Sequence, residues 1–449
     1  MRIKKGKACP YVVSLCFEKE NDYGLKEGEH YLFNDGKKAV LTFCVGNKDY
    51  NRDMVRRAAS VANTVAHKLK KKELLLDCPK GFNYKEVAPL FAQGLTLSRF
   101  SLDYKSKKEK KAVLNLILKE VTPAVKEAVA MAEAQNYSRQ LANMPPNRGT
   151  PEFFAREAKK IAKTSNLRVR VLDKKALAKK GMNLALAVNS GSSNGVYLVH
   201  LIYKPAKAKK RVAIVGKGIT FDSGGLGIKP GKSMLDMNLD KSGACDVLAV
   251  MRYIREVKPK VEVHGIAIFT ENLPSGTAYK PSDVIESYSG KTVEVQHTDA
   301  EGRLILADAL AYADKDVKAD YIIDVATLTG AMLTTLGDKA IGLFTNSKKL
   351  SQILSRAGDD TFERVWELPM YKEYGEMVKS DIADIKNIGS WDGKAGSITA
   401  AKFLEEFVGK REWAHLDIAS MMEAEWLPYI GKRGSGAGTR LLLESLKAF

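Results

Sequence analysis

The sequence lacks any long hydrophobic run. A membrane-spanning helix needs about 18 consecutive apolar residues, and no such stretch occurs. Residues 11–17 form a short apolar run after a basic start, which superficially imitates a secretory leader. Ser14 interrupts this run, and it leads into Glu18 without a small-residue cleavage site. We therefore expect no membrane association, and we interpret residues 11–17 as a first β-strand.

Cysteine is scarce, and the usual metal-binding patterns of cysteine and histidine are missing. The five cysteines make an odd set without CxxC spacing, which predicts free thiols in a reducing cytoplasm. Cys245 lies close in sequence to acidic residues discussed below, and packing is the favoured interpretation for it. The sequence has no HExxH motif, which excludes a conventional zinc protease site.

Negative charge is in deficit. The chain has 72 lysines and arginines against 53 aspartates and glutamates, a net charge of +19. The lysines gather in short blocks at residues 70–72, 105–111 and 207–211. Aromatic residues do not alternate with these blocks, and no nucleic-acid-binding motif accompanies them. A solvated surface is the favoured interpretation, and a polyanion such as nucleic acid is the alternative partner.

The length of 449 residues is too great for one ordinary core and predicts two unequal domains. In the first part, strand-like runs at 11–17, 39–45 and 73–77 alternate with a helical pattern at 51–71, which indicates a small α/β domain. Residues 122–143 have helical periodicity and stop before Pro145, so they predict a connecting helix. Pro151 then marks a new helix start.

The second part contains apolar runs between helical stretches. They fall at residues 211–216, 261–269, 321–328, 340–344 and 413–419. Strands that are buried on both faces have continuous apolar sequences, so this pattern predicts a larger C-terminal α/β domain with a mostly parallel sheet flanked by helices. Ligands of such sheets bind at the carboxyl ends of the strands.

Two clusters of charged residues follow predicted strands of this sheet. The first spans residues 215–229 and continues to Asp240, and the second spans residues 297–304 after the strand-like 292–296. Together they supply four carboxylates, two lysines and one arginine. Two like charges about 4 Å apart repel by about 4 kcal/mol at an effective dielectric constant near 20. Bound metal ions would remove that cost.

The residue types in these clusters favour hard divalent cations. Two ions held about 3.5 to 4 Å apart can bind and deprotonate a water, and four carboxylates balance their charge. Oxygen-rich ligands favour Mn, Mg or Zn over a soft metal. A lysine beside such ions can lose its proton and ligate, or it can stay charged and stabilise an oxyanion. Arg303 is suited to hold a small planar anion.

Weaker interpretations stand beside this one. Taken singly, Lys217, Asp222 or Asp240 would be a surface residue or a helix cap. Residues 227–233 resemble a phosphate-binding loop, but three residues separate the glycines where that motif has four. Residues 191–195 fit the GxSxG pattern of serine hydrolases, with Ser193 as the nucleophile, although no histidine and aspartate partners can be identified.

The spacing of these residues strongly resembles the leucyl aminopeptidase family of cytosolic two-metal exopeptidases. The resemblance covers residues 143–449, and further segments support it at residues 143–151, 324–331, 387–401 and 415–419. Together with the patterns above, it predicts a small N-terminal α/β domain at 1–121, a connecting helix at 122–144 and a catalytic domain at 145–449.

The resemblance also implies roles for individual residues. A tighter metal site would use Lys217, Asp222, Asp240 and Glu301, and a more exchangeable site Asp222, Asp299 and Glu301. Lys229 would stabilise the tetrahedral oxyanion. Arg303 would hold a bicarbonate that acts as general base toward the water activated by the two metals. The pocket for the first side chain would be lined by Met237, Thr327 and Gly330, with an apolar preference such as leucine.

The same resemblance implies a cytoplasmic hexamer that acts on peptides with a free N-terminus and uses Mn or Zn, possibly Mg. Two departures from the family pattern stand out. His297 occupies a position where the family usually has asparagine, and we interpret it as a hydrogen-bonding replacement that positions the loop; a role as ligand or proton relay is the alternative. Residues 420–425 differ from the usual small-residue sequence, which affects substrate preference more than reaction type.

Overall fold

The computed structural model describes residues 2–6, 8–106 and 114–449. It divides into two compact units: residues 1–136 with 424–432, and residues 137–423 with 433–449. The division falls within helix α3 (Pro123–Ala142), which the sequence predicts as the connecting helix. The first unit also contains residues 424–432, where the chain returns to it from the second unit. This return was not predicted from the sequence. Much of the lysine block at 105–111 lies outside the described residues.

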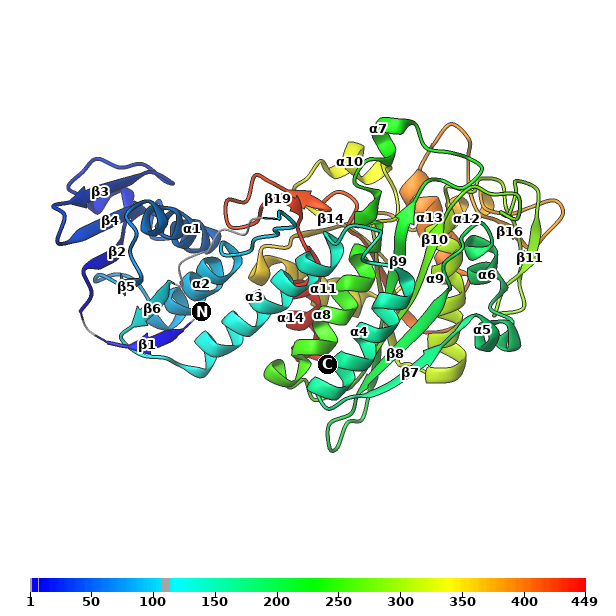
Figure 1. Cartoon of the computed structure of the whole chain (residues 1–449), viewed down its shortest axis with the longest axis horizontal. Helices are drawn as coiled ribbons and strands as arrows, with labels where there is room; N and C mark the ends of the chain where they lie inside the picture. Colours follow the sequence, from blue (N-terminus) through cyan, green and yellow to red (C-terminus); the bar gives the residue numbers. More distant parts are fainter. Residues whose placement is uncertain (1, 7, 107–113) are drawn as a thin grey trace. The chain divides into compact units, whose positions relative to one another are not determined.

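The first unit is a sheet with helices, as Figure 1 shows. Its sheet has the order β1-β6-β5-β2-β4-β3, and every pair is parallel except β3 with β4. The strands are β1 (Ile3–Lys5), β2 (Tyr11–Cys16), β3 (His30–Asn34), β4 (Ala39–Cys44), β5 (Glu73–Asp77) and β6 (Asn115–Leu118), and the helices are α1 (Asp53–Lys68), α2 (Tyr84–Leu97) and a short turn at Glu18–Glu20. The predicted strand at 11–17 is therefore confirmed as β2.

The second unit is built on an eight-stranded sheet of order β15-β14-β17-β13-β9-β10-β8-β7. Its centre, β17-β13-β9-β10, is parallel, while β8, β7 and the β14–β17 pair add antiparallel neighbours. The strands are β7 (Arg168–Leu172), β8 (Tyr197–Tyr203), β9 (Arg211–Asp222), β10 (Glu262–Asn272), β13 (Tyr321–Ala326), β14 (Ile341–Thr345), β15 (Val365–Glu367) and β17 (Glu412–Asp417). The predicted mostly parallel α/β sheet is confirmed.

Helices cover both faces of this sheet (Figure 1). On one face lie α4 (Pro151–Thr164), α8 (Ser242–Val257) and α14 (Thr439–Ser445), and on the other α6 (Asn183–Asn189) and α9 (Glu301–Tyr312). Every residue of β10 and β13 is buried, which is why these strands have continuous apolar sequences. Helix α4 begins as predicted: Thr150 is its N-cap, and its hydroxyl accepts a hydrogen bond from the backbone N–H of Phe153.

Further elements complete the second unit. They are α5 (Lys174–Lys180), α7 (Gly231–Met234), η2 (Met237–Lys241), β11 (Val284–Glu286), β12 (Thr292–Glu294), η3 (Ala313–Val317), α10 (Ala331–Leu336), α11 (Lys348–Thr361), α12 (Glu373–Glu376), β16 (Ile385–Lys386), α13 (Gly396–Glu405) and η4 (Leu446–Ala448). The short strands β18 (Glu423–Ala424) and β19 (Gly431–Gly434) each contain a point at which the chain passes from one unit to the other. All five cysteines are free thiols, and Cys245 is buried. In the described part of the chain, no helix is long and apolar enough to cross a membrane.

Candidate metal centre and active site

The first charged cluster lies on and just after the central strand β9. Lys217 is paired with Ile268 in the register with β10, and Asp222 ends the strand opposite Asn272. The loop that follows turns sharply at Gly224, whose φ is +88°. A Cβ atom on Gly224 would lie 2.9 Å from a carboxylate oxygen of Asp299, so the absence of a side chain lets this loop close on the second cluster.

The second cluster lies between β12 and α9. Asp299 is in the loop, Glu301 is the first residue of α9, and Arg303 is in its first turn. The side-chain amide of Asn387 holds this loop: its Oδ1 accepts the backbone N–H groups of Gln296 and His297, and its Nδ2 donates to the carbonyl of His297 at 2.7 Å. The orientation of Asp299 is thus set by a residue from a segment about ninety positions later in the chain.

Two residues join the clusters to each other. The amide of Asn272 donates to Asp222 Oδ1 at 2.8 Å and to the carbonyl of Thr298 at 3.0 Å. The hydroxyl of Thr298 donates to the carbonyl of Gly224 and accepts from the N–H of Gly227, both at 2.7 Å. The sequence analysis assigned no role to Asn272 or Thr298, because neither bears a charge. The available signals were the position of Asn272 opposite Asp222 in the β9–β10 register and the position of Thr298 within the second cluster, next to Asp299.

Lys217 is buried among carboxylates. Its Nζ lies 2.7 Å from Asp240 and 3.0 Å from Glu301, and it donates to the backbone carbonyl of Thr327 at 2.9 Å. Burial alone would lower the pKa of Lys217, but the nearby carboxylates outweigh it and raise the pKa overall. Space for this side chain comes from Gly302, where a Cβ atom would lie only 2.4 Å from Lys217 Cε.

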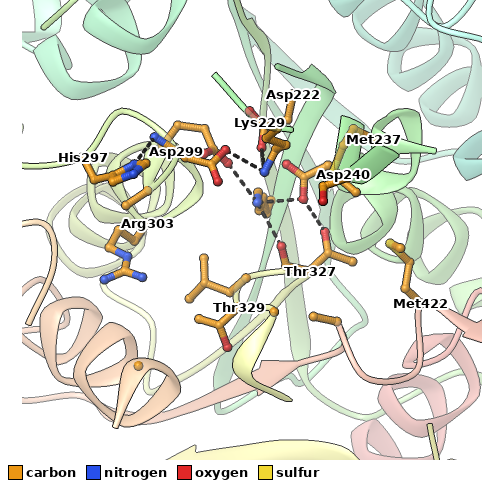
Figure 2. A pocket seen from close by; sticks show the side chains of 18 of the residues that line it. Asp222, Lys229, Met237, Asp240, His297, Asp299, Arg303, Thr327, Thr329 and Met422 are labelled. Carbon is orange, nitrogen blue, oxygen red and sulfur yellow. Dashed lines mark hydrogen bonds and ion pairs between the residues drawn. The ribbon is translucent and has the colours of Figure 1, made fainter. Parts of the chain in front are cut away.

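Lys229 bridges the other side of the cluster, as Figure 2 shows. Its Nζ lies 2.9 Å from Asp222 and 2.6 Å from Asp299. Burial again opposes the charged form, but attraction to the carboxylates, Asp222 foremost, raises the pKa of Lys229 overall. The two lysines therefore divide the acidic cluster between them, and only Lys229 contacts Asp299 in this arrangement.

The carboxylates are arranged as ligands for a cation. One oxygen each of Asp222, Asp299 and Glu301 lies within 4.8 Å of the others. Asp240 is outside that triad but shares Lys217 with Glu301, and its Oδ1 accepts a hydrogen bond from the Thr327 hydroxyl at 2.8 Å. The structure thus brings all five residues expected to bind metal into one cluster.

Burial makes the charged form of this cluster costly. It raises the pKa of Asp240 to about 8, that of Glu301 to about 7 and that of Asp299 to about 6, and the neighbouring carboxylates add to each rise. Asp240 Oδ2 and Glu301 Oε2 are buried without a hydrogen-bond partner. Buried acceptors without a donor are rare in proteins, and hard oxygen atoms are what divalent cations bind. The residues present therefore fit divalent metal ions.

Arg303 is held at one end only. Its Nη1 donates to the backbone carbonyl of Asn387 at 2.6 Å, while its buried Nε has no partner. Burial lowers the pKa of Arg303 to about 10, which leaves the group charged at neutral pH. An anchored guanidinium with a free donor edge can accept a small planar anion.

A cavity of about 520 Å³ opens on these groups. Met237, Thr327 and Gly330 line it, as the sequence predicts. Further apolar lining residues were not predicted from the sequence: Leu328, Leu333, Ile388, Ala419 and Met422. Asp417 positions part of this wall, because its carboxylate accepts the N–H of Leu328 at 3.1 Å and the hydroxyl of Thr329 at 2.7 Å.

His297 also lines the cavity, and its Nδ1 accepts the backbone N–H of Asp299 at 3.0 Å. This bond matches the predicted role of positioning the loop (Figure 2). Burial lowers the pKa of His297, with help from Lys229 and Arg303.

The serine of the GxSxG pattern has different surroundings. Ser193 is exposed, and its neighbours Ser192 and Asn194 hydrogen-bond to Glu271. In the described part of the chain, no hydrogen bond between Ser193 and a histidine is found.

Unpartnered acidic oxygens at the ends of parallel strands are typical of metal-dependent enzymes, and the metal-dependent hydrolases are one such class. Residues 136–443 match the catalytic domain of the cytosol aminopeptidase family. A probable cytosol aminopeptidase of Aquifex aeolicus is 44% identical over 443 residues, which cover 95% of this chain and 88% of that protein. A probable cytosol aminopeptidase of Persephonella marina is 40% identical over 88% of this chain and 84% of its own.

Solved structures agree with these relatives. The bottromycin maturation enzyme BotP in complex with Mn superposes with a TM-score of 0.89 at 30% identity, covering 98% of this chain and 99% of BotP. The chain therefore belongs to the cytosol aminopeptidase family and is a metal-dependent aminopeptidase, a hydrolase that acts on peptides.

Proposed function

We propose that this aminopeptidase removes an apolar N-terminal residue, leucine foremost, from peptides, and that it binds two divalent metal ions in the cluster described above. The observation that carries the proposal is the close approach of Asp222, Asp299 and Glu301 together with the unpartnered buried oxygens of Asp240 and Glu301.

The two ions would be held by overlapping sets of ligands. Lys217, Asp222, Asp240 and Glu301 form the tighter site, and Asp222, Asp299 and Glu301 the more exchangeable one. Lys217 would belong to the first set as a neutral amine, because the ammonium form has no lone pair with which to bind a cation. Mn or Zn, with Mg possible, suits the oxygen-rich donors. When bound, such ions polarise the peptide carbonyl and lower the pKa of a water to near neutrality.

Lys229 acts on the substrate. Its ammonium is anchored by Asp222 and Asp299 at the edge of the cavity, so it is placed without further reorganisation to donate to the scissile carbonyl oxygen. Negative charge grows on that oxygen as the tetrahedral intermediate forms. A fixed donor there stabilises the transition state more than the ground state.

Arg303 holds the group that moves the proton. Arg303, through its free Nε edge, would hold a bicarbonate, which would supply a general base for the attacking water and an acid for the leaving amine. Among the other bases that line the described cavity, the four carboxylates are assigned to the metal ions, and the Nδ1 of His297 already accepts the N–H of Asp299.

The substrate's own groups fit the remaining walls. Its free α-amine lies against the acidic cluster, which confines cleavage to the first residue. The first side chain occupies the wall that contains Met237, Thr327 and Gly330. Apolar neighbours such as Leu333 and Met422 favour leucine over a charged residue, because a charge there loses its hydration without a partner. By analogy with the family, the chain functions as a cytoplasmic hexamer.

The test is hydrolysis of p-nitroanilides of leucine, glutamate and lysine by the full chain. We expect activity on the leucine compound to disappear after chelation and return with Mn or Zn, with kcat/KM at least about tenfold above that for glutamate. Equal rates on all three substrates would contradict the apolar pocket. Activity that survives complete metal removal would contradict the metal assignment.

A further inference from the structure

A second cavity of the catalytic unit is lined by positive charge. It measures about 480 Å³ and is formed by the end of β8, the loop from β8 to β9, and the connection from α8 to β10. Its lining residues are Tyr203, Pro205, Ala206, Lys207, Arg255, Lys258, Pro259 and Lys260. Four of them are cations and none of these described residues is acidic. The volume is within the range of small-molecule pockets, about 300 to 1,000 Å³.

This cavity is separate from the active site. It lies at the amino end of β9, before Arg211, whereas the acidic cluster begins at Lys217 and ends with Asp222 at the carboxyl end. The six residue steps along β9 from Arg211 to Lys217 correspond to roughly 20 Å. The metal-dependent reaction therefore does not account for the charges here.

The fold itself brings the cations together. The N–H of Glu262 donates to the carbonyl of Lys210 at 3.0 Å, which ties the loop carrying Lys207 to the segment carrying Lys258 and Lys260. Lys207 and Lys258 have positive φ angles of 67° and 53°, so both loops turn tightly at this edge.

Nearby acidic residues do not neutralise the cavity. Glu262 pairs with Lys204 at 3.2 Å and with His264, and Asp320 pairs with Lys210 at 3.1 Å. None of these three contacts involves a cation that lines the cavity. Glu256 is exposed on α8 and is not among the lining residues.

Arg255 is fixed without losing its charge. Its guanidinium donates to the backbone carbonyls of Ser165 and Asn166 and lies 5.7 Å from the centre of the Tyr203 ring. Neutral carbonyl acceptors orient the group but leave its charge uncompensated. The cavity thus combines one oriented fork-shaped donor with three flexible ammonium groups.

We infer that this cavity, which we name the basic cavity, binds a small molecule bearing two or three linked phosphates. Four cations match the charge of a short phosphate chain, and both guanidinium and ammonium groups form strong bonds to phosphate oxygens. A nucleic-acid strand fits less well, because the one ring of the cavity, Tyr203, is 7% exposed and offers no face for base stacking. This ligand is independent of the peptidase substrate.

The test uses inorganic tripolyphosphate as the probe and isothermal titration calorimetry with the full chain. The pocket variant is Lys207→Ala/Lys258→Ala/Lys260→Ala. The matched control is Lys174→Ala/Lys175→Ala/Lys179→Ala, which removes the same charge from exposed positions of α5. We expect saturable binding by the wild type that is weakened at least about tenfold in the pocket variant and unchanged in the control. Hydrolysis of leucine p-nitroanilide should be equal in all three proteins, which shows that the variants fold.

Several results would overturn the inference. Absence of binding by the wild type would do so, as would equal weakening in the control, which would indicate nonspecific attraction to net charge. Binding of duplex DNA that depends on the three pocket lysines, without binding of tripolyphosphate, would replace the small ligand with a nucleic acid.

Discussion

Two buried polar clusters of the catalytic unit differ in how completely their hydrogen bonds are satisfied. At the carboxyl end of β9, Asp240 and Glu301 each leave a buried oxygen without a partner. Between β8 and β10, His200 and His264 form a closed chain: Tyr312 OH to His200 Nδ1 at 3.1 Å, His200 Nε2 to His264 Nδ1 at 2.8 Å, and His264 Nε2 to Glu262 at 3.1 Å.

This difference in hydrogen bonding separates a cluster with a function in catalysis from a cluster that stabilises the fold. A closed network stabilises the fold as it stands and needs nothing more. An open acidic network, in contrast, is costly by itself and becomes favourable when cations arrive. We therefore expect substitutions in the acidic cluster to affect chemistry, and substitutions in the histidine cluster to affect stability.

The largest effect is expected from a matched pair of substitutions. Glu301→Gln removes a carboxylate shared by both proposed metal sites, so kcat/KM should fall by more than about 10³-fold and bound metal should decrease. Glu262→Gln makes the same chemical change in the histidine cluster and should leave kcat/KM within about twofold. Steady-state kinetics and metal analysis by mass spectrometry measure both. Equal loss of activity in the two variants would remove the distinction between the clusters.

The next effect concerns Lys229. Lys229→Met keeps the length of the side chain but removes the donor for the oxyanion, so kcat should fall by about 10²- to 10³-fold. Both metal ions should remain, because Lys229 is not among the proposed ligands. Loss of metal from this variant would instead make Lys229 part of the ligand set.

The histidine cluster should make stability depend on pH. Burial lowers the pKa of His200 to about 3 and that of His264 to about 4, below the value of about 6.5 in an unfolded chain. Between these values the unfolded state binds more protons, so the free energy of unfolding decreases as pH falls below about 6.5, by up to about 1.4 kcal/mol per pH unit for each histidine.

Urea unfolding of the wild type and of His200→Gln/His264→Gln at pH 7.0 and 5.0 measures this difference. The variant should lose about 4 kcal/mol less than the wild type over that interval, about 2 kcal/mol for each histidine, and its activity at neutral pH should be retained. An identical pH dependence in both proteins would mean that the histidines do not contribute.

The smallest effect is expected at Asn387, which contacts the acidic cluster only through its loop. Asn387→Ala removes the amide that holds the backbone of residues 296 and 297, so Asp299 should become less well placed. We expect kcat to fall about tenfold with little change in KM. Asn346→Ala, which removes a surface-loop amide, is the control and should leave both constants unchanged. A change in KM alone would assign Asn387 to substrate binding.

Much of the catalytic fold could be predicted from sequence, because its central strands are buried on both faces. Continuous apolar runs at 211–216 and 321–328 correspond to β9 and β13, and the connecting helix predicted at 122–143 is α3. The antiparallel β7 was not predicted, because its residues are only partly buried and its arginines interrupt the apolar pattern. The return of residues 424–432 to the first unit depends on long-range contacts, such as the bond from Tyr429 to Asp53, that leave no periodic signal.

The candidate site divides in the same way. The charged residues could be predicted, because several acidic side chains directly after buried parallel strands indicate a ligand site at that edge of the sheet. The neutral residues that orient these charged side chains could not be predicted. Asn272, Thr298 and Asn387 are of residue types that occur throughout most sequences, so their presence alone does not indicate a role. The apolar wall at Leu333 and Met422 comes from segments separated from the clusters along the chain, and only the tertiary structure places them at the cavity.

The central claim is that the acidic cluster binds two divalent cations. Anomalous diffraction from crystals grown with Mn tests it most directly. We predict two peaks per chain, one contacted by Lys217, Asp222, Asp240 and Glu301, and the other by Asp222, Asp299 and Glu301. Crystals that show one peak, or peaks elsewhere while Lys217 keeps its ion pairs with Asp240 and Glu301, would contradict it.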